Sequence, residues 1–335
     1  MVDLSKYADL IRRHVNVADE RLGAAVLFAT DEFFGPAPRM LNPSEPEWRA
    51  GVYDAHGKWM DGWETRRRRD QGHDYCIVKL AGPCRLALLE IDTRYFTGNY
   101  PPFASVQASN LVSEPDAHTQ WTDLLPSSPL KGDERNFFEL QSTGIWTHLK
   151  LNLYPDGGVA RLRAYGLLQR EQDLSNKAVD LAAALNGGRA LACSDEHYGA
   201  MGNLLLPGRG ASMADGWETR RRRELPGFDW VIVRLGCSGR IQCVEVDTAH
   251  FKGNYPHQIS INAAHIREYS DEELSSECLH WPVLLPPEFL QADSVVQFRD
   301  QLRDLGSVSH VRVNMHPDGG LSRVRLFGQP DRGSG

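Results

Sequence analysis

A nine-residue segment repeated without change is the strongest constraint on this fold. DGWETRRRR occupies residues 61–69 and recurs at 215–223. The segment contains Trp, Glu and four Arg, so chance is a poor explanation for its recurrence. The chain is therefore a duplication, and both halves are expected to adopt the same fold.

Further matches define the extent of each copy. LEIDTRYFTGNYP at 89–101 matches VEVDTAHFKGNYP at 244–256, and THLKLNLYPDGGVARLRAYG at 147–166 matches SHVRVNMHPDGGLSRVRLFG at 309–328. The entry motifs FATDEFFG and ACSDEHYG also match, and after them the first copy carries roughly ten extra residues. Each copy has roughly 150 residues, enough for an independent core. We predict a first repeat over 17–166, a linker over 167–180 and a second repeat over 181–328.

Composition and charge exclude several classes of protein. The chain is 41% apolar and 24% charged, and it has no apolar run long enough to cross a bilayer. Its formal charge of −7 argues against nucleic-acid binding. The N-terminus lacks the apolar core of a secretory signal, and the six cysteines form no CxxC pair. We therefore expect a cytoplasmic protein with reduced thiols and no membrane partner.

Apolar and polar residues alternate with the two-residue period of strands. Leu89 and Ile91 fall on one face, and Glu90 and Asp92 fall on the other. The two alternating runs that flank PDGG at 155–158 predict a hairpin, and 311–328 repeats the pattern. A helix is predicted only over short segments such as 176–186, which ends before Gly-Gly. The fold class is all-β: two tandem jelly-roll β-sandwiches of the galactose-binding or discoidin-like type, with short helices.

The repeated motifs resemble those of the allantoicase family. The resemblance rests on DGWETRRRR, the IDTRYFTGNYP segment and THLKLNLYPDGGVARLRAYG, and it runs from about residue 18 to residue 328. It implies hydrolysis of allantoate to ureidoglycolate and urea in the degradation of purines. In the second copy, CSDEHY replaces the TDEFF form of the entry motif, which leaves open whether both halves are catalytic.

Hydrolysis of a ureido group needs a proton donor and acceptor, which carboxyl and imidazole groups supply. Glu64 follows an Asp-Gly turn, Glu90 lies on a predicted strand, and His148 recurs in both copies. A structural alternative stays open, because duplication would copy an ion-pair lattice as readily as a site. The catalytic candidates are Glu64, Glu90 and His148, with Glu218, Glu245 and His310 as their copies.

An anionic ureide also needs a cation and amide groups. Arginine binds a carboxylate through two parallel hydrogen bonds, which favours Arg66 as the anchor for the substrate carboxylate. We expect Arg66 and Arg68 to share one face of a strand, with Arg67 and Arg69 on the other. The substrate-binding candidates are Asp61, Trp63, Arg66, Asn99 and Asn152, with Asp215, Trp217, Arg220, Asn254 and Asn314 as their copies.

No cofactor is expected with confidence, because HxH, HExxH and CxxC spacings are all absent. A divalent cation held by Asp61, Glu64 or Glu90 with His148 is an alternative that would activate water. The alternative function is a tandem carbohydrate-binding module without catalysis, a common use of this jelly roll. A homo-oligomer is also open, since polar faces duplicated in each half could be buried between subunits.

Overall fold

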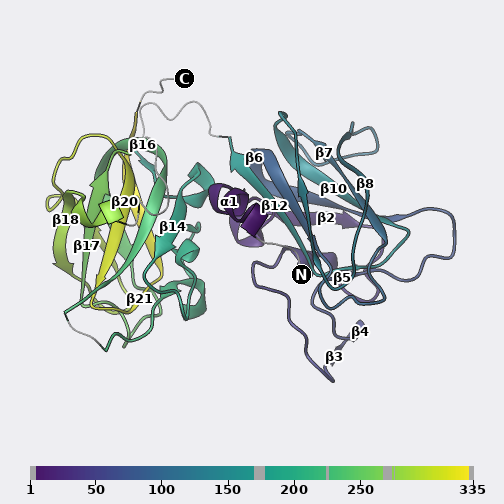
Figure 1. The fold of residues 1–335 in the computed structure, drawn as a ribbon, viewed down its shortest axis with the longest axis horizontal. Helices are drawn as coiled ribbons and strands as arrows, with labels where there is room; N and C mark the ends of the chain where they lie inside the picture. The colour runs from purple at the N-terminus through teal and green to yellow at the C-terminus, as the bar shows by residue number, and fades with distance from the viewer. Residues whose placement is uncertain (1–4, 170–177, 224–225, 267–273, 275, 332–335) are drawn as a thin grey trace. The chain divides into compact units, whose positions relative to one another are not determined.

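The computed structural model describes residues 5–169, 178–223, 226–266, 274 and 276–331. The chain divides into two compact units, Met1–Gln169 and Arg170–Gly335, and each consists mainly of strands (Figure 1). The prediction of two all-β jelly rolls is confirmed. None of the described helices is long and apolar enough to cross a membrane.

The first unit begins with one α-helix, and strands make up most of the rest. Its elements are α1 (Ser5–Arg13), β1 (Val15–Asn16), η1 (Glu20–Leu22), β2 (Ala25–Ala29), η2 (Ala37–Leu41), β3 (Tyr53–Asp54), β4 (Gly57–Lys58), β5 (Trp63–Glu64), β6 (Asp74–Asp92), β7 (Phe103–Ser109), β8 (Thr122–Pro129), β9 (Arg135–Glu139), β10 (Trp146–Tyr154), β11 (Gly158–Val159) and β12 (Arg161–Leu168), where η denotes a 3-10 helix.

The second unit repeats the order of the strands, without a counterpart of α1 or of the β3–β4 hairpin among its described residues and with the additional 3-10 helices η5 and η6. Its elements are β13 (Val179–Asp180), η3 (Ala184–Asn186), β14 (Arg189–Cys193), η4 (Met201–Leu205), η5 (Met213–Asp215), β15 (Trp217–Glu218), β16 (Asp229–Asp247), β17 (Gln258–Ala264), η6 (Cys278–His280), β18 (Val283–Phe289), β19 (Val295–Phe298), β20 (Val308–His316), β21 (Gly320–Leu321) and β22 (Arg323–Pro330).

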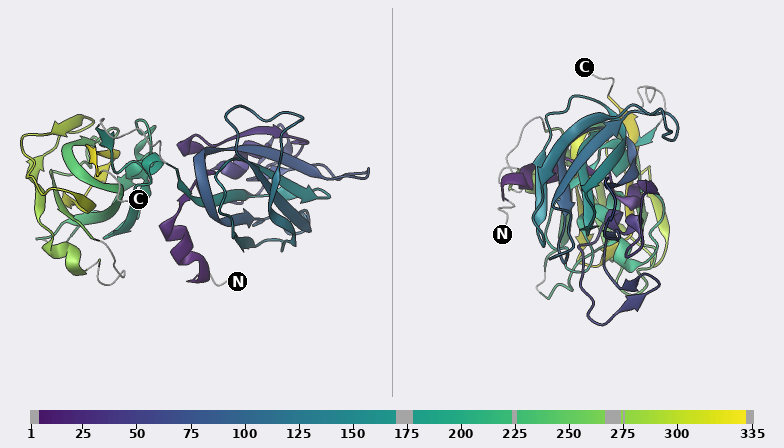
Figure 2. Two further views of the ribbon diagram at one scale, coloured as in Figure 1. Left: turned by 90° about the horizontal axis from the view of Figure 1, so that it is seen from above. Right: turned by 90° about the vertical axis from the view of Figure 1, so that its right-hand side faces the viewer.

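One long strand in each unit connects the two layers of the sandwich. The first part of β6 pairs with β2 and β10, and its last part pairs with β12 and β9. One layer is therefore β2-β6-β10-β7-β8, and the other is β1-β12-β6-β9. In the second unit β16 plays the same part, pairing with β14 and β20 and then with β22 and β19. The two layers of each unit can be followed in Figure 2.

The core fills the space between these layers as the alternation predicts. Leu149, Leu151 and Leu153 of β10 are fully buried, and so are Leu89 and Ile91 of β6. Their burial together removes several hundred Å² of apolar surface from water, which is the main stabilising contribution in such a domain.

The predicted PDGG hairpin is wrong. The strands on either side of it, β10 and β12, do not pair with each other, because each pairs with a different part of β6. The turn instead carries the chain from one layer to the other, and β11 in between pairs with β5. Alternating residues mark a strand with one buried face, but they do not say which strand is its neighbour.

The predicted helix over 176–186 is also wrong where the structure describes it. Residues 176 and 177 lie outside the described residues, and the rest form β13 and the single turn η3. β13 pairs with β22, so tertiary pairing overrides the helical preference of the Ala and Leu residues. The strands also extend each repeat by a few residues beyond the predicted limits, from β1 to Leu168 and from β13 to Pro330.

Candidate active site

A half-buried glutamate lies against an asparagine amide at one end of the first sandwich. Glu64 ends β5, where its backbone N–H donates to Gly35 O (3.1 Å) and its pairing partner is Gly158 of β11. The Gly158 N–H donates to Asn99 O (2.7 Å), which brings the loop after β6 to the same place. There Asn99 Nδ2 donates to Glu64 Oε1 at 2.7 Å. The fold thus joins two residues 35 positions apart in one pair.

The second repeat builds the same pair. Asn254 Nδ2 donates to Glu218 Oε1 at 2.6 Å, and the Gly320 N–H donates to Asn254 O at 2.8 Å. Glu218 ends β15, which pairs with β21 as β5 pairs with β11. Of the sequence candidates, these two glutamates and two asparagines are the ones that the structure brings into direct contact.

The pKa of Glu64 is raised above the ordinary value for a glutamate. Burial of the carboxyl is the largest cause, because it penalises the charged form. The hydrogen bond from Asn99 and the positive charge of Lys58 act in the opposite direction and are the smaller causes. A carboxyl whose pKa is moved toward neutrality is suited to exchanging protons with a substrate.

The tight turn beside this pair depends on PDGG. A Cβ on Gly158 would lie 2.0 Å from the ring of Phe96, and one on Gly320 would lie 2.0 Å from the ring of Phe251. Both phenylalanines are fully buried. The second glycine of each PDGG therefore lets the backbone pass close to an aromatic ring, where any side chain would clash.

The tryptophans of DGWETRRRR lie in the core. Trp63 and Trp217 have 0% of their surface exposed. Their indole N–H groups donate to the backbone oxygens of Asp31 (2.8 Å) and Asp195 (2.9 Å). Both rings are packed in the core, and a substrate-binding role for them stays a prediction.

Asp61 and Asp215 are held by buried arginines. Arg161, which is 1% exposed, donates to Asp61 Oδ2 at 2.6 Å, and Arg323 donates to Asp215 Oδ2 at 2.8 Å. Arg161 also donates to the Ser44 and Asp61 carbonyl oxygens, so it ties three stretches of chain together. These contacts hold the loops before β5 and β15, and the substrate-binding role of the two aspartates stays a prediction.

The arginine run is not a strand, contrary to expectation. Residues 65–69 have no strand partners, and each arginine has its own surroundings. Arg66 is exposed and pairs with Asp31 (2.7 Å), as Arg220 pairs with Asp195 (3.2 Å). Arg68 binds Asp74 at 2.6 Å. Residues 66–70 line a cleft of ≈580 Å³ with Thr30, Asp31 and Asp74.

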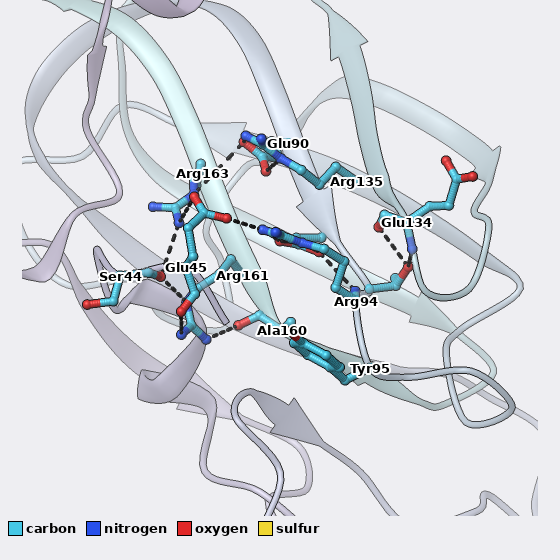
Figure 3. Close-up of polar contacts among 12 residues, drawn as sticks. Ser44, Glu45, Glu90, Arg94, Tyr95, Glu134, Arg135, Ala160, Arg161 and Arg163 are labelled. Atoms are coloured by element: carbon cyan, nitrogen blue, oxygen red, sulfur yellow. Dashed lines mark hydrogen bonds and ion pairs between the residues drawn. The ribbon is translucent and has the colours of Figure 1, made fainter. Parts of the chain in front are cut away.

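Glu90 lies in the ion-pair lattice that the structural alternative describes (Figure 3). Its fully buried carboxylate accepts two hydrogen bonds from Arg135 (2.6 and 3.0 Å) and one from the Tyr165 hydroxyl (3.1 Å). Its copy Glu245 is half-buried and accepts from Gln297 Nε2 at 2.7 Å. Glu90 is thus part of the lattice, and its catalytic role stays a prediction.

The neighbouring aspartates are neutralised in different ways in the two repeats. Asp92 pairs with Arg94 (2.6 Å), which also contacts Glu45. In the second repeat Ala249 stands in place of that arginine. Arg209, which stands in place of Glu45, pairs with Asp247 at 3.3 Å. Each buried aspartate thus keeps a cation, but the cation comes from a different segment.

The remaining candidates lie on the outer face of the five-stranded layer. His148 is buried and its Nδ1 lies 2.9 Å from Thr147 Oγ1, while His310 Nδ1 lies 2.8 Å from Ser309 Oγ. Burial lowers the pKa of both histidines, that of His310 to about 4, so both are neutral at pH 7. Asn152 and Asn314 donate to the hydroxyl groups of Ser105 and Ser260. These hydrogen bonds lie within the sheet and involve neither Glu64 nor Glu218.

The sequence left open a divalent cation held by Asp61, Glu64 or Glu90 with His148. Within the described part of the chain, no three His, Cys, Asp or Glu side chains are grouped as metal ligands. Asp61 binds Arg161 and Glu90 binds Arg135, so these carboxylates do not converge with His148 on Glu64. The donor set proposed from sequence is therefore dispersed among separate structural contacts.

Two jelly rolls that each hold a half-buried carboxyl against an amide define a duplicated β-sandwich protein equipped for acid–base chemistry on a small polar molecule. Residues 15–169 and 179–331 each match the allantoicase repeat. The chain is 51% identical over 319 residues to a probable allantoicase of Photobacterium profundum, covering 94% of this chain and 96% of that protein. It is also 51% identical to a probable allantoicase of Pseudomonas paraeruginosa, with 95% and 97% covered.

The fold agrees with this similarity. The crystal structure of allantoicase from Saccharomyces cerevisiae matches with a TM-score of 0.82 at 32% identity, covering 98% of each chain. A second allantoicase structure matches with a TM-score of 0.83 at 33% identity. The chain belongs to the allantoicase family.

Burial of the charged Glu64 carboxylate is expected to lower the stability of the folded chain, and replacing this residue with a neutral one should remove that cost. Because the folded-state pKa lies above the unfolded value, the folded chain binds this proton more tightly, so stability falls as pH rises from the unfolded to the folded pKa. Glu64→Gln keeps the hydrogen bond from Asn99 without the charge. We expect the variant to have a higher Tm than the wild type at pH 7, and the difference to shrink toward pH 4. Thermal unfolding at the two pH values would contradict this reasoning if the variant were less stable at pH 7.

Proposed function

We propose that this chain hydrolyses allantoate to ureidoglycolate and urea, with the glutamate–asparagine pair as its catalytic centre. One observation carries the assignment: the pairs Glu64–Asn99 and Glu218–Asn254 lie in the same place in both repeats, with Oε1 held by the amide at 2.7 and 2.6 Å. In each glutamate no hydrogen bond to Oε2 is found among the described residues, which leaves an acceptor or donor position for a ligand.

The reaction needs one proton moved in each direction. The carbon of allantoate that carries the carboxylate also carries two ureido groups. As the bond from this carbon to one ureido nitrogen breaks, the electron pair goes to nitrogen, and the Glu64 carboxyl gives that nitrogen a proton. Water then bonds to the carbon and returns a proton to the Glu64 carboxylate. Urea leaves, ureidoglycolate remains, and the carboxyl group is restored.

Asn99 orients the carboxyl in this scheme. Its amide donates to Oε1, which directs the proton of the neutral acid to the other oxygen, toward the substrate. The raised pKa of Glu64 supports the acid role, because it increases the fraction of protonated carboxyl at a given pH.

Release of urea separates catalysis from binding. Purified protein incubated with allantoate is expected to form urea and ureidoglycolate in equal amounts, measured with urease and by chromatography. A chain that bound sugars on an array and released no urea above the uncatalysed rate would instead be a carbohydrate-binding module.

We further propose that the reaction needs no divalent cation, because Glu64 can serve as both donor and acceptor. Dialysis against EDTA is then expected to leave kcat/KM within about twofold, an effect too small for loss of a catalytic ion. Loss of activity that Mn²⁺ or Zn²⁺ restored would replace this proposal with metal-activated water.

We propose a cytoplasmic location, supported by the buried free thiols of Cys76 and Cys84. A formal charge of −7 supports a small-molecule substrate rather than nucleic acid. Whether the protein forms a homo-oligomer is a separate question that light scattering would answer.

A further inference from the structure

The first repeat has a segment beside its glutamate–asparagine pair that the second repeat lacks. Between Pro43 and Asp61 the chain is about ten residues longer than between the matching Pro207 and Asp215. The extra length forms the β3–β4 hairpin, in which Tyr53 pairs with Lys58 (Figure 1). The other strands of the two repeats have counterparts, so among the described residues the hairpin is the strand pair that only the first repeat has.

This hairpin is held to the site by specific contacts. Asp54 binds Arg39 of η2 at 2.5 Å, and Arg39 also donates to Met60 O at 2.9 Å. His56 Nδ1 lies 3.0 Å from Phe33 O. The backbone N–H of Phe34 donates to the Glu64 carbonyl oxygen at 3.2 Å. The tip of the hairpin is therefore anchored to η2 and to the segment that hydrogen-bonds Glu64.

The hairpin carries an ammonium group to aromatic residues beside the loop of Asn99. Lys58 Nζ lies 4.3 Å from the centre of the Trp48 ring, and Trp48 stacks on Tyr95 with ring centres 6.4 Å apart. Tyr95 belongs to the loop that also carries Asn99. Among the described residues no carboxylate lies within ion-pair distance of Lys58, and its charge acts on the Glu64 carboxyl. Trp48 and Tyr95 thus form an aromatic wall, and Lys58 lies on this wall without a carboxylate partner among the described residues.

The second repeat has a thioether in the comparable place. Met213 Sδ lies 3.9 Å from Asn254 Nδ2, and Met213 comes from the short loop that replaces the hairpin. His250 corresponds to Tyr95, with φ of 71° and 70°, but its Nε2 lies 2.8 Å from Gly210 O and no aromatic wall forms. A sulfur atom cannot attract a carboxylate, whereas an ammonium group can.

We infer that the first repeat contains the productive site, and that Lys58 binds the carboxylate of allantoate while Glu64 serves the departing urea nitrogen. The inference rests on the proposed function, because it assigns the parts of the same reaction. The carboxylate is bonded to the carbon at which the C–N bond breaks, so recognition of allantoate requires a cation on an element next to Glu64. The hairpin is such an element, because it contacts the segment that hydrogen-bonds the Glu64 backbone. Lys58 thereby determines specificity for an anionic ureide.

Urea release by Glu64→Gln, Glu218→Gln and the double variant separates the two sites. Two equal sites would each lose about half of kcat on single substitution. We expect instead that Glu64→Gln alone falls to the level of the double variant, and that Glu218→Gln loses at least tenfold less. Equal losses in the two single variants would overturn the assignment to the first repeat while leaving the glutamate mechanism intact. Full activity in the double variant would overturn the proposed function itself.

Lys58→Met tests recognition of the carboxylate. Loss of a charge-assisted hydrogen bond is expected to raise KM for allantoate about 10- to 100-fold with little change in kcat, and Lys58→Arg is expected to restore most of the affinity. Rising ionic strength should raise KM in the wild type more than in Lys58→Met. Lys252→Met, on the loop before Asn254, is the matched control and should keep wild-type kinetics. An unchanged KM in Lys58→Met would overturn its role.

Discussion

The double variant Glu64→Gln/Glu218→Gln is expected to release urea from allantoate about 10²- to 10⁴-fold more slowly than the wild type, the usual contribution of a general acid–base group. Glutamine keeps the shape of the side chain and can still accept the bond from Asn99 or Asn254. It cannot give a proton to the leaving nitrogen or take one from water. The effect should therefore appear mainly in kcat, with KM changed little.

Asn99→Ala in the Glu218→Gln background gives a graded comparison. It removes the group that orients the carboxyl but leaves the carboxyl itself, so its loss should be smaller than that of the double glutamine variant. Circular dichroism and thermal unfolding establish that each variant is folded. Wild-type turnover by a folded double glutamine variant would exclude both glutamates from the chemistry.

Glu90→Gln is expected to lower the free energy of unfolding by about 3–5 kcal/mol, the cost of leaving a buried charge without its partner. Glu90 is fully buried, and Arg135 and Arg163 both lie against it. Removing its charge leaves two guanidinium groups facing each other across a neutral amide. Urea denaturation followed by tryptophan fluorescence measures the loss.

Glu245→Gln is the matched control for this prediction. It occupies the same position in β16, is half-buried, and accepts a hydrogen bond from the neutral Gln297. Its substitution should cost less than about 1 kcal/mol, as for surface charges in general. Equal losses in the two variants would show that the lattice around Glu90 contributes no more than an exposed contact.

The sequence predicted the fold class and the repeats because duplication and strand periodicity are local signals. It placed Leu149, Leu151 and Leu153 in the core correctly. The pairing of β10 and β12 with different parts of β6 could not be read from alternation, since a strand's neighbours depend on long-range contacts.

The site was predicted in part. Glu64 and Asn99 were both candidates, but nothing in the spacing showed that they touch. The contacts of Arg161, which decide the place of Asp61, join segments far apart in the sequence and could not be read from spacing. Lys58, which we propose as the ligand of the substrate carboxylate, was not among the candidates, because these recur in both copies and Lys58 lies in a segment with no copy. Trp63 recurs too and is fully buried, so duplication preserves core residues as well as candidate site residues.

The cations that neutralise Asp92 and Asp247 limit which segments of one repeat can replace the matching segments of the other. A chimera that received the Glu45 loop in the second repeat would lose Arg209 and leave Asp247 beside Ala249, with a buried charge and no counterion. The reverse exchange would bring Arg209 next to Arg94, two cations competing for Asp92. The two halves have therefore diverged by paired changes, and segments of one can replace those of the other only when both members of a pair move together.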